Sequence, residues 1–235
     1  MKSYTYLLID FTTVVACFIF SFHKRIQFYR HFRSFFNAAI LVGIPFIAWD
    51  IWFAAKGVWW FNEKYTLGLF IFGLPLEEWL FFICIPFSCV FTFYCLDKFF
   101  DLRKADKYSG IITGLMLIVS ITVALLFRSR IYPFVTALIL AGSFIYLYFI
   151  AEVRWIGRAS LVYLLLMMGF FPVNGILTGM ALRSPIVNYN PNMILGIRVL
   201  TIPVEDFFYG YVQFLLNVYC FMLFKGDRQL QKMHS

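Results

Sequence analysis

The chain has 235 residues, of which 62% are hydrophobic and only 14% are charged. Soluble globular proteins carry about 25% charged residues, so this composition excludes a soluble globular domain and indicates a membrane protein. The net charge is +8, but basic loops are usual in membrane proteins, and we do not infer nucleic-acid binding from it.

Apolar stretches of about membrane-spanning length follow one another along the chain. We expect seven spans, at residues 4–22, 35–55, 68–96, 109–127, 132–151, 159–181 and 200–224. The predicted fold is therefore an all-α polytopic membrane bundle. Asp10, a lone acid near the outer end of the first span, is expected at the membrane interface. Asn174 in the sixth span is expected to form a hydrogen bond between helices.

Lysine and arginine are distributed unevenly over the two ends of these spans. The loops after the first, third and fifth spans, together with the C-terminus, hold 13 of the 20 basic residues. The positive-inside rule places these segments in the cytoplasm and the N-terminus outside. His23 and His31 in the first of these loops and His234 in the tail are expected in water or at lipid headgroups. The five cysteines lie inside apolar stretches without CxxC spacing and are expected to be small core residues.

Two pairs of adjacent acids interrupt the apolar sequence. Glu77 and Glu78 are followed by 18 uncharged residues, and so are Glu205 and Asp206. Acids within membrane spans are costly and usually face a partner or a cavity, and burial favours the protonated form of a carboxyl group. A protonated carboxyl in an apolar pocket is a proton donor. The alternative is that these acids lie in the first turn of a helix and complement its dipole.

The two acid pairs belong to an internal repeat. Residues 61–78 (FNEKYTLGLFIFGLPLEE) align without a gap with residues 189–206 (YNPNMILGIRVLTIPVED), at an offset of 128. The repeat predicts two parallel three-span units, residues 1–108 and 129–235, joined by a linking span at 109–128. Repeats of this kind place functional groups between the two halves, so we expect both acid pairs at one cavity.

Aromatic residues surround both acid pairs in the sequence, and the faces of aromatic rings stabilise cations. These residues are Trp59, Trp60, Phe61, Trp79, Phe81 and Phe82 at the first pair, and Tyr189, Phe207, Phe208 and Tyr209 at the second. An aromatic belt at the membrane interface is the alternative, above all for Trp59 and Trp60. A donor acid beside aromatic walls inside a membrane fits protonation of an alkene in a lipophilic substrate.

The motifs PLEEWLFF (75–82) and PVEDFFYG (203–210), with WDIW (49–52), GVWWFN (57–62) and the repeat, resemble the small membrane lycopene cyclases built from two homologous domains. The resemblance is to the fused two-domain form found in bacteria and archaea. It implies β-cyclisation of the ψ-ends of lycopene, through γ-carotene to β-carotene. It also implies catalytic roles for the acids Asp50, Glu77, Glu78, Glu205 and Asp206. Asp50 has no acidic counterpart, because Thr178 lies at the 128 offset.

Glu77 and Glu205 are identical between the two copies and are expected to be the proton donors. The candidate substrate contacts are Trp59, Trp60, Phe61, Asn62, Trp79, Phe81, Phe82, Asn190, Phe207, Phe208 and Tyr209. The expected partners are a lipophilic carotenoid and membrane lipid. We expect no cofactor and no metal, because the sequence has neither a GxGxxG fingerprint after a strand nor an HExxH motif.

Three other functions remain open at this point. A related cyclase would form an ε-ring or act on a C50 carotenoid. A membrane prenyltransferase would hold Mg²⁺ on a diphosphate, with acids spaced on one helix face as in DxxxD, which adjacent acids do not match. A proton-coupled transporter would use the acids to relay protons.

Overall fold

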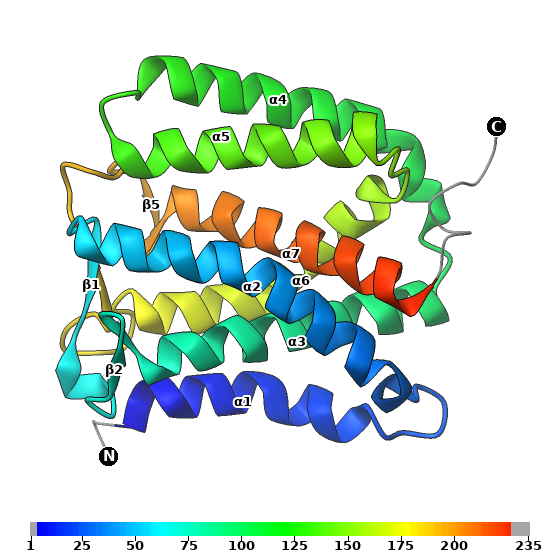
Figure 1. Ribbon diagram of the computed structural model, residues 1–235, viewed down its shortest axis with the longest axis horizontal. Helices are drawn as coiled ribbons and strands as arrows, with labels where there is room; N and C mark the ends of the chain where they lie inside the picture. Colours follow the sequence, from blue (N-terminus) through cyan, green and yellow to red (C-terminus); the bar gives the residue numbers. More distant parts are fainter. Residues whose placement is uncertain (1–3, 227–235) are drawn as a thin grey trace.

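The structure, a computed structural model, describes residues 4–226, so His234 lies outside the described part. Within it, seven α-helices lie side by side in one bundle (Figure 1), which confirms the all-α prediction. Six helical segments are long and apolar enough to cross a membrane, while α1 is shorter. The helices are α1 (Thr5–Phe20), α2 (Phe32–Ala55), α3 (Leu76–Phe99), α4 (Ser109–Leu126), α5 (Ile131–Ile145), α6 (Ile156–Leu177) and α7 (Val204–Lys225).

The third and seventh helices begin later than expected. Residues 68 and 200 were expected inside helices, but the chain there forms two short hairpins at one end of the bundle (Figure 1). In one, β2 (Phe70–Ile71) pairs with β3 (Leu74–Pro75), and in the other, β5 (Arg198–Val199) pairs with β6 (Ile202–Pro203). Gly68 and its counterpart Gly196 have φ angles of 77° and 84°, and Leu200 at the start of the expected seventh span has one of 57°. This left-handed conformation suits glycine and excludes a continuous helix.

A third strand pair joins the two copies of the repeat. β1 (Trp59–Phe61) runs antiparallel to β4 (Val187–Tyr189), and Trp60 lies opposite Asn188, which is 128 residues further along the chain. The backbone contacts that flank this pair are also repeated: Asn62 N donates to Ile186 O and Asn190 N donates to Val58 O, both at 2.8 Å. The two copies thus meet through equivalent residues, as expected around an approximate two-fold axis.

The helices extend from the end of the bundle that holds these strands and pack against one another as layers (Figure 1). α2 lies against α7 and α3, α1 lies against α3, and α4 lies on α5 at the outer edge of the bundle (Figure 1). The core between them is strongly aromatic: Phe28 contacts the rings of Phe87, Phe91 and Phe221. The five cysteines are free and buried or half-buried, as expected.

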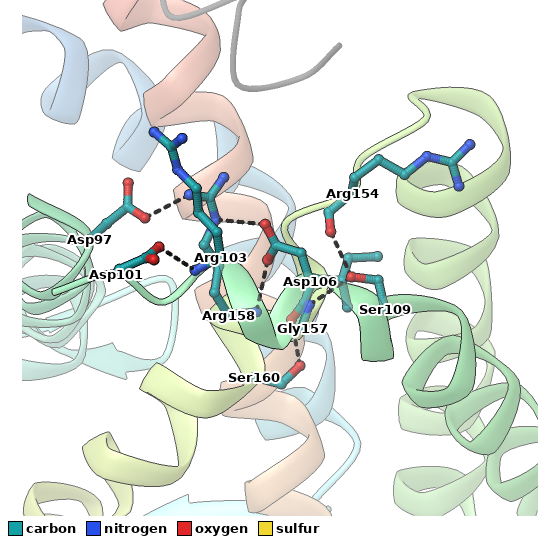
Figure 2. A network of polar contacts seen from close by, with 10 residues as sticks. Asp97, Asp101, Arg103, Asp106, Ser109, Arg154, Gly157, Arg158 and Ser160 are labelled. Atoms are coloured by element: carbon teal, nitrogen blue, oxygen red, sulfur yellow. Dashed lines mark hydrogen bonds and ion pairs between the residues drawn. The ribbon is translucent and has the colours of Figure 1, made fainter. Parts of the chain in front are cut away.

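The other end of the bundle is held together by a buried arginine (Figure 2). Arg158, at the start of α6, is 2.7 Å from Asp97 on α3 and 3.5 Å from Asp106, which precedes α4. Beside it, Gly157 packs so closely that a Cβ atom there would lie 1.9 Å from the carbonyl oxygen of Ala105. This network links α3, α4 and α6 at the end opposite the two acid pairs.

Candidate active site

The acid pairs lie in the first turns of α3 and α7. These helices begin immediately after Pro75 and Pro203, which end the two hairpins. All four side chains are buried. The ion pairs found in the described part of the chain both involve Arg158, so none of these acids has an ion-pair partner there. For buried acids without an ion-pair partner, hydrogen bonds and bound protons largely determine the charge; Glu205 also interacts electrostatically with Arg198 and Arg130.

The first acid of each pair anchors the loop that precedes its helix. Glu77 Oε1 accepts a hydrogen bond of 2.6 Å from the backbone N–H of Leu67. Glu205 Oε1 accepts the equivalent bond from Leu195. Neither Glu77 nor Glu205 is among the residues that line the cavity described next. The structure therefore places these two residues, which sequence reasoning preferred as donors, at the loop anchors.

The second acid of each pair lines a shared cavity. The cavity has a volume of about 470 Å³ and lies among α1, α3, α6 and α7, with β1 and β4 at one end. Glu78, Asp206 and Asp50 all reach it. Pockets of about 300–1,000 Å³ with mostly apolar walls and a few converging polar groups are typical of small-molecule sites. One acid from each copy of the repeat therefore meets the same space.

Glu78 is joined to a second carboxyl group. Its side chain forms a hydrogen bond with that of Asp50 on α2, and Glu78 Oε2 accepts another from the hydroxyl of Tyr6 on α1. A hydrogen bond between two carboxyl groups needs a proton on one of them, because two carboxylates offer no donor. The Asp50–Glu78 pair thus holds a proton inside the cavity.

Asp206 has a different environment, because three neutral donors surround it. Tyr132 Oη donates to Oδ1 at 2.7 Å, and Oδ2 accepts from Tyr189 Oη at 2.8 Å and from Asn174 Nδ2 at 3.0 Å. Burial and the nearby Asp206 raise the pKa of the Tyr189 phenol well above its ordinary value, so this hydroxyl stays a donor. Several donors favour the ionised form of a carboxyl group. Asp206 is thereby suited to accept a proton or to stabilise a cation.

This difference arises from divergence within the repeat. At the offset of 128, Tyr189 corresponds to Phe61, which has no hydroxyl, and Asn174 corresponds to Phe46. Asp50 corresponds to Thr178, whose hydroxyl is bonded to Asn174 O at 2.8 Å and to Thr201 Oγ1 at 2.7 Å. One half of the site thus has an additional acid, and the other half has additional donors.

The aromatic residues expected at the site divide into two groups. Trp59, Phe61, Phe81 and Tyr209 line the cavity. The other expected contacts are not among its lining residues, and they are Trp60, Asn62, Trp79, Phe82, Asn190, Phe207 and Phe208. Trp60 is 50% exposed, which fits the alternative of an interfacial aromatic residue.

The two asparagines of the repeat bond loop residues instead, and Asn62 Nδ2 also donates to Ser184 Oγ and Pro185 O in the other copy. Asn62 Oδ1 accepts from Lys64 N at 3.2 Å, and Asn190 Oδ1 accepts from Asn192 N at 3.1 Å. Both side chains thus bond the backbone two residues ahead, as in an Asx-turn. They stabilise the two loops that carry the acid pairs toward their helices.

Sequence reasoning missed the two tyrosines that bond the acids from α1 and α5. Tyr6 and Tyr132 are both buried and contact Glu78 and Asp206, respectively. They lie 126 residues apart, so a search of the repeat that allowed a shift of two residues would have aligned them. Asn174, expected to bond between helices, does so with Asp206.

A membrane-length helical bundle with acids and aromatic rings around a cavity fits a membrane protein that takes a lipophilic ligand. The family model described as lycopene cyclase matches this chain twice, over residues 3–96 and over residues 129–224. The chain therefore belongs to the lycopene cyclase family, and it is an enzyme of carotenoid cyclisation with a lipophilic carotenoid as its substrate. No curated protein and no solved structure matches it significantly.

Proposed function

We propose that this enzyme is a lycopene β-cyclase that closes the ψ-ends of lycopene in turn, giving γ-carotene and then β-carotene. The reaction is an isomerisation of the intramolecular-lyase type without net redox change. One observation carries the proposal: a carboxyl pair that holds a proton and a carboxylate with three donors line the same cavity. Proton-initiated ring closure needs one acid and one base at the two faces of one end group.

In the first step, the Asp50–Glu78 pair protonates C2 of the terminal double bond. The π electrons of C1=C2 form the new C2–H bond, and a tertiary cation remains at C1. We assign the donor role to this pair rather than to Glu77, because Glu77 is bonded to the Leu67 backbone outside the cavity lining. A positioned general acid typically contributes 10²–10⁴-fold to the rate.

In the second step, the C5=C6 double bond attacks C1, which closes the six-membered ring and moves the cation to C5. Asp206 then removes the proton from C6, and the electrons of the broken C6–H bond form the C5=C6 double bond of the β-ring. The protein thus gains one proton for each one that it gives. Trp59, Phe61, Phe81 and Tyr209 surround the reacting end, and their ring faces stabilise the cation as it moves.

The substrate reaches this site from the membrane. We propose that the N-terminus lies outside, because 13 of the 20 basic residues lie at the other end of the spans. Membrane lipid is the phase from which the carotenoid enters, because six helical segments have membrane-spanning length and composition. The hairpin end of the bundle, with the acids, then lies toward the outer side (Figure 1). A carotenoid end group enters the cavity while the rest of the polyene stays in the bilayer.

The test is cyclisation by the purified enzyme in D₂O without added cofactor. The expected product is β-carotene with one deuterium at C2 of each ring, and Glu78→Gln in folded protein should abolish it. Rings without solvent deuterium, or a strict need for a reduced cofactor, would refute the mechanism. Expression in lycopene-producing bacteria distinguishes the other functions: ε-rings or an exclusive action on C50 carotenoids would replace the assignment, and unchanged pigment would contradict it.

A further inference from the structure

The active-site cavity opens to the outside of the bundle between α1 and α6. Of the residues that line the cavity, three are exposed on the surface of the molecule: Thr12 on α1, and Gly169 and Pro172 on α6. The other lining residues are buried or half-buried. Near the hairpins, α1 and α6 share an apolar cluster through Tyr6 and Leu177. The opening therefore lies farther along both helices, away from the hairpins.

This opening faces the hydrocarbon core of the membrane. Gly169 lies near the middle of α6, and the helix carries no charged residue between Arg158 and its end at Leu177. On the outer surface beside Gly169, the exposed side chains of Leu165 and Met168 are apolar. A chain that leaves the cavity here enters the phase in which a carotenoid dissolves.

The α1 side of the opening is also suited to an apolar chain. Asp10 was expected at the membrane interface, but it is only 1% exposed, because α1 packs against α3. Its carboxyl group is thus kept away from the opening. The hydroxyl of Thr12 donates to the carbonyl oxygen of Ile9 at 2.9 Å. No unpaired side-chain donor of Thr12 would therefore meet a hydrocarbon in the opening.

The distance from the acids to the opening matches one end group. Asn174, which donates to Asp206, is five residues from Gly169, or about 7.5 Å along α6. Tyr6, which donates to Glu78, is six residues from the opening on α1, or about 9 Å along that helix. Carbons C1–C6 can lie within this distance, and the conjugated chain beyond C6 then has to continue through the opening.

We propose that the polyene of the carotenoid passes through this opening while its end group reacts, and that Gly169 determines whether the polyene fits. A Cβ atom at Gly169 would have no other atom within 4 Å, so the packing of the protein does not require glycine there. The missing side chain leaves room for the substrate instead. This inference rests on the site proposed above for the end group, and it adds the route by which each end enters and leaves.

The first test narrows the opening. Gly169→Leu should lower the rate of lycopene consumption at least about tenfold, as overpacking of a filled space would, and Gly169→Ala should have a smaller effect. Gly142→Leu on α5 is the matched control, because Gly142 is also exposed with nothing within 4 Å of a Cβ atom but does not line the cavity. It should retain the wild-type rate. Loss of lycopene is measured, so the result does not depend on which ring forms.

A short ligand separates the opening from the space around the acids. ψ-Ionone is a C13 ketone with the same acyclic end group, and its chain ends at C9, so it can lie behind the opening. Its inhibition constant against lycopene should be unchanged in Gly169→Leu. Equal weakening of ψ-ionone and lycopene would place Gly169 at the end group and overturn the proposal.

A wild-type rate in Gly169→Leu, or equal slowing in Gly142→Leu, would also overturn it. If Gly169→Leu does not fold, Thr12→Phe narrows the same opening from α1, and the same contrast between lycopene and ψ-ionone is expected. Full activity in Glu78→Gln would instead refute the proposed donor, and it would leave this contrast unaffected.

Discussion

Asp50 and Glu78 share a hydrogen bond inside the cavity, although they lie on different helices and are 28 residues apart. Two carboxyl groups share a hydrogen bond only when one of them carries a proton, so the pair keeps a proton at the cavity. Asp50 has no acidic counterpart in the repeat, but it has a carboxyl partner in Glu78 across the helices.

The pair predicts the effect of Asp50→Asn. An asparagine preserves the size of the side chain and a hydrogen bond to Glu78, but it cannot hold the transferable proton. We expect ring closure to slow by about 10²-fold or more, measured by chromatography of carotenoids with purified enzyme. Thr178→Val, the isosteric change at the repeat-related position, should have little effect. Wild-type rates in Asp50→Asn would mean that Glu78 protonates the substrate unaided.

Glu77 and Glu205 should behave as structural residues. Replacing either by leucine leaves the backbone N–H of Leu67 or Leu195 without its acceptor, at a cost of about 1–3 kcal/mol. Glutamine keeps an acceptor oxygen and should restore most of this stability, together with activity. Thermal inactivation in detergent measures the first effect. Loss of ring closure in well-folded Glu77→Gln would return the donor role to Glu77.

The contrast between these acids shows how far the sequence could predict the site. The apolar stretches were sufficient to predict the helical bundle, but not where the third and seventh helices begin. They could not separate Glu77 from Glu78, because adjacent residues in a first helical turn point in directions that differ by about 100°. The direction that each one takes depends on the hairpin before α3, where Gly68 turns the chain and Leu67 bonds Glu77. Contacts across helices, such as Tyr6 with Glu78, likewise follow from packing alone.

Asp206 should determine which ring forms, in addition to how fast. The cation at C5 gives a β-ring when C6 loses its proton, an ε-ring when C4 does, and an exocyclic double bond when the methyl group does. With Asp206→Asn we expect slow formation of a mixture of these rings, resolved by chromatography and mass spectrometry. Tyr189→Phe removes one of three donors and should slow β-ring formation by about 10–10²-fold. Pure β-rings at the normal rate from Asp206→Asn would exclude it as the base.

The network around Arg158 predicts a loss of stability unrelated to the chemistry (Figure 2). In Gly157→Ala the new methyl group would lie 1.9 Å from the carbonyl oxygen of Ala105, so η4 (Arg103–Tyr108) or α6 must move. Overpacking of this kind costs about 1–3 kcal/mol or more. Gly114→Ala on α4, where nothing lies within 4 Å, is the matched control and should be neutral or slightly stabilising. Equal melting temperatures for the two variants would contradict the close packing at Gly157.

The asymmetry of the acids predicts one catalytic site per chain, used twice. The cavity lining extends on α7 from Asp206 to Asn217, about 16 Å along the helix, so it holds one end of the carotenoid. Because the cavity has one donor pair and one base, the second end has to enter the same cavity after the first has left. Monocyclic product should therefore appear before bicyclic product and exchange with added unlabelled γ-carotene. Glu78→Gln should block both rings. Bicyclic product that forms without such exchange, or a Glu78→Gln enzyme that stops at one ring, would show that each half of the molecule closes its own ring.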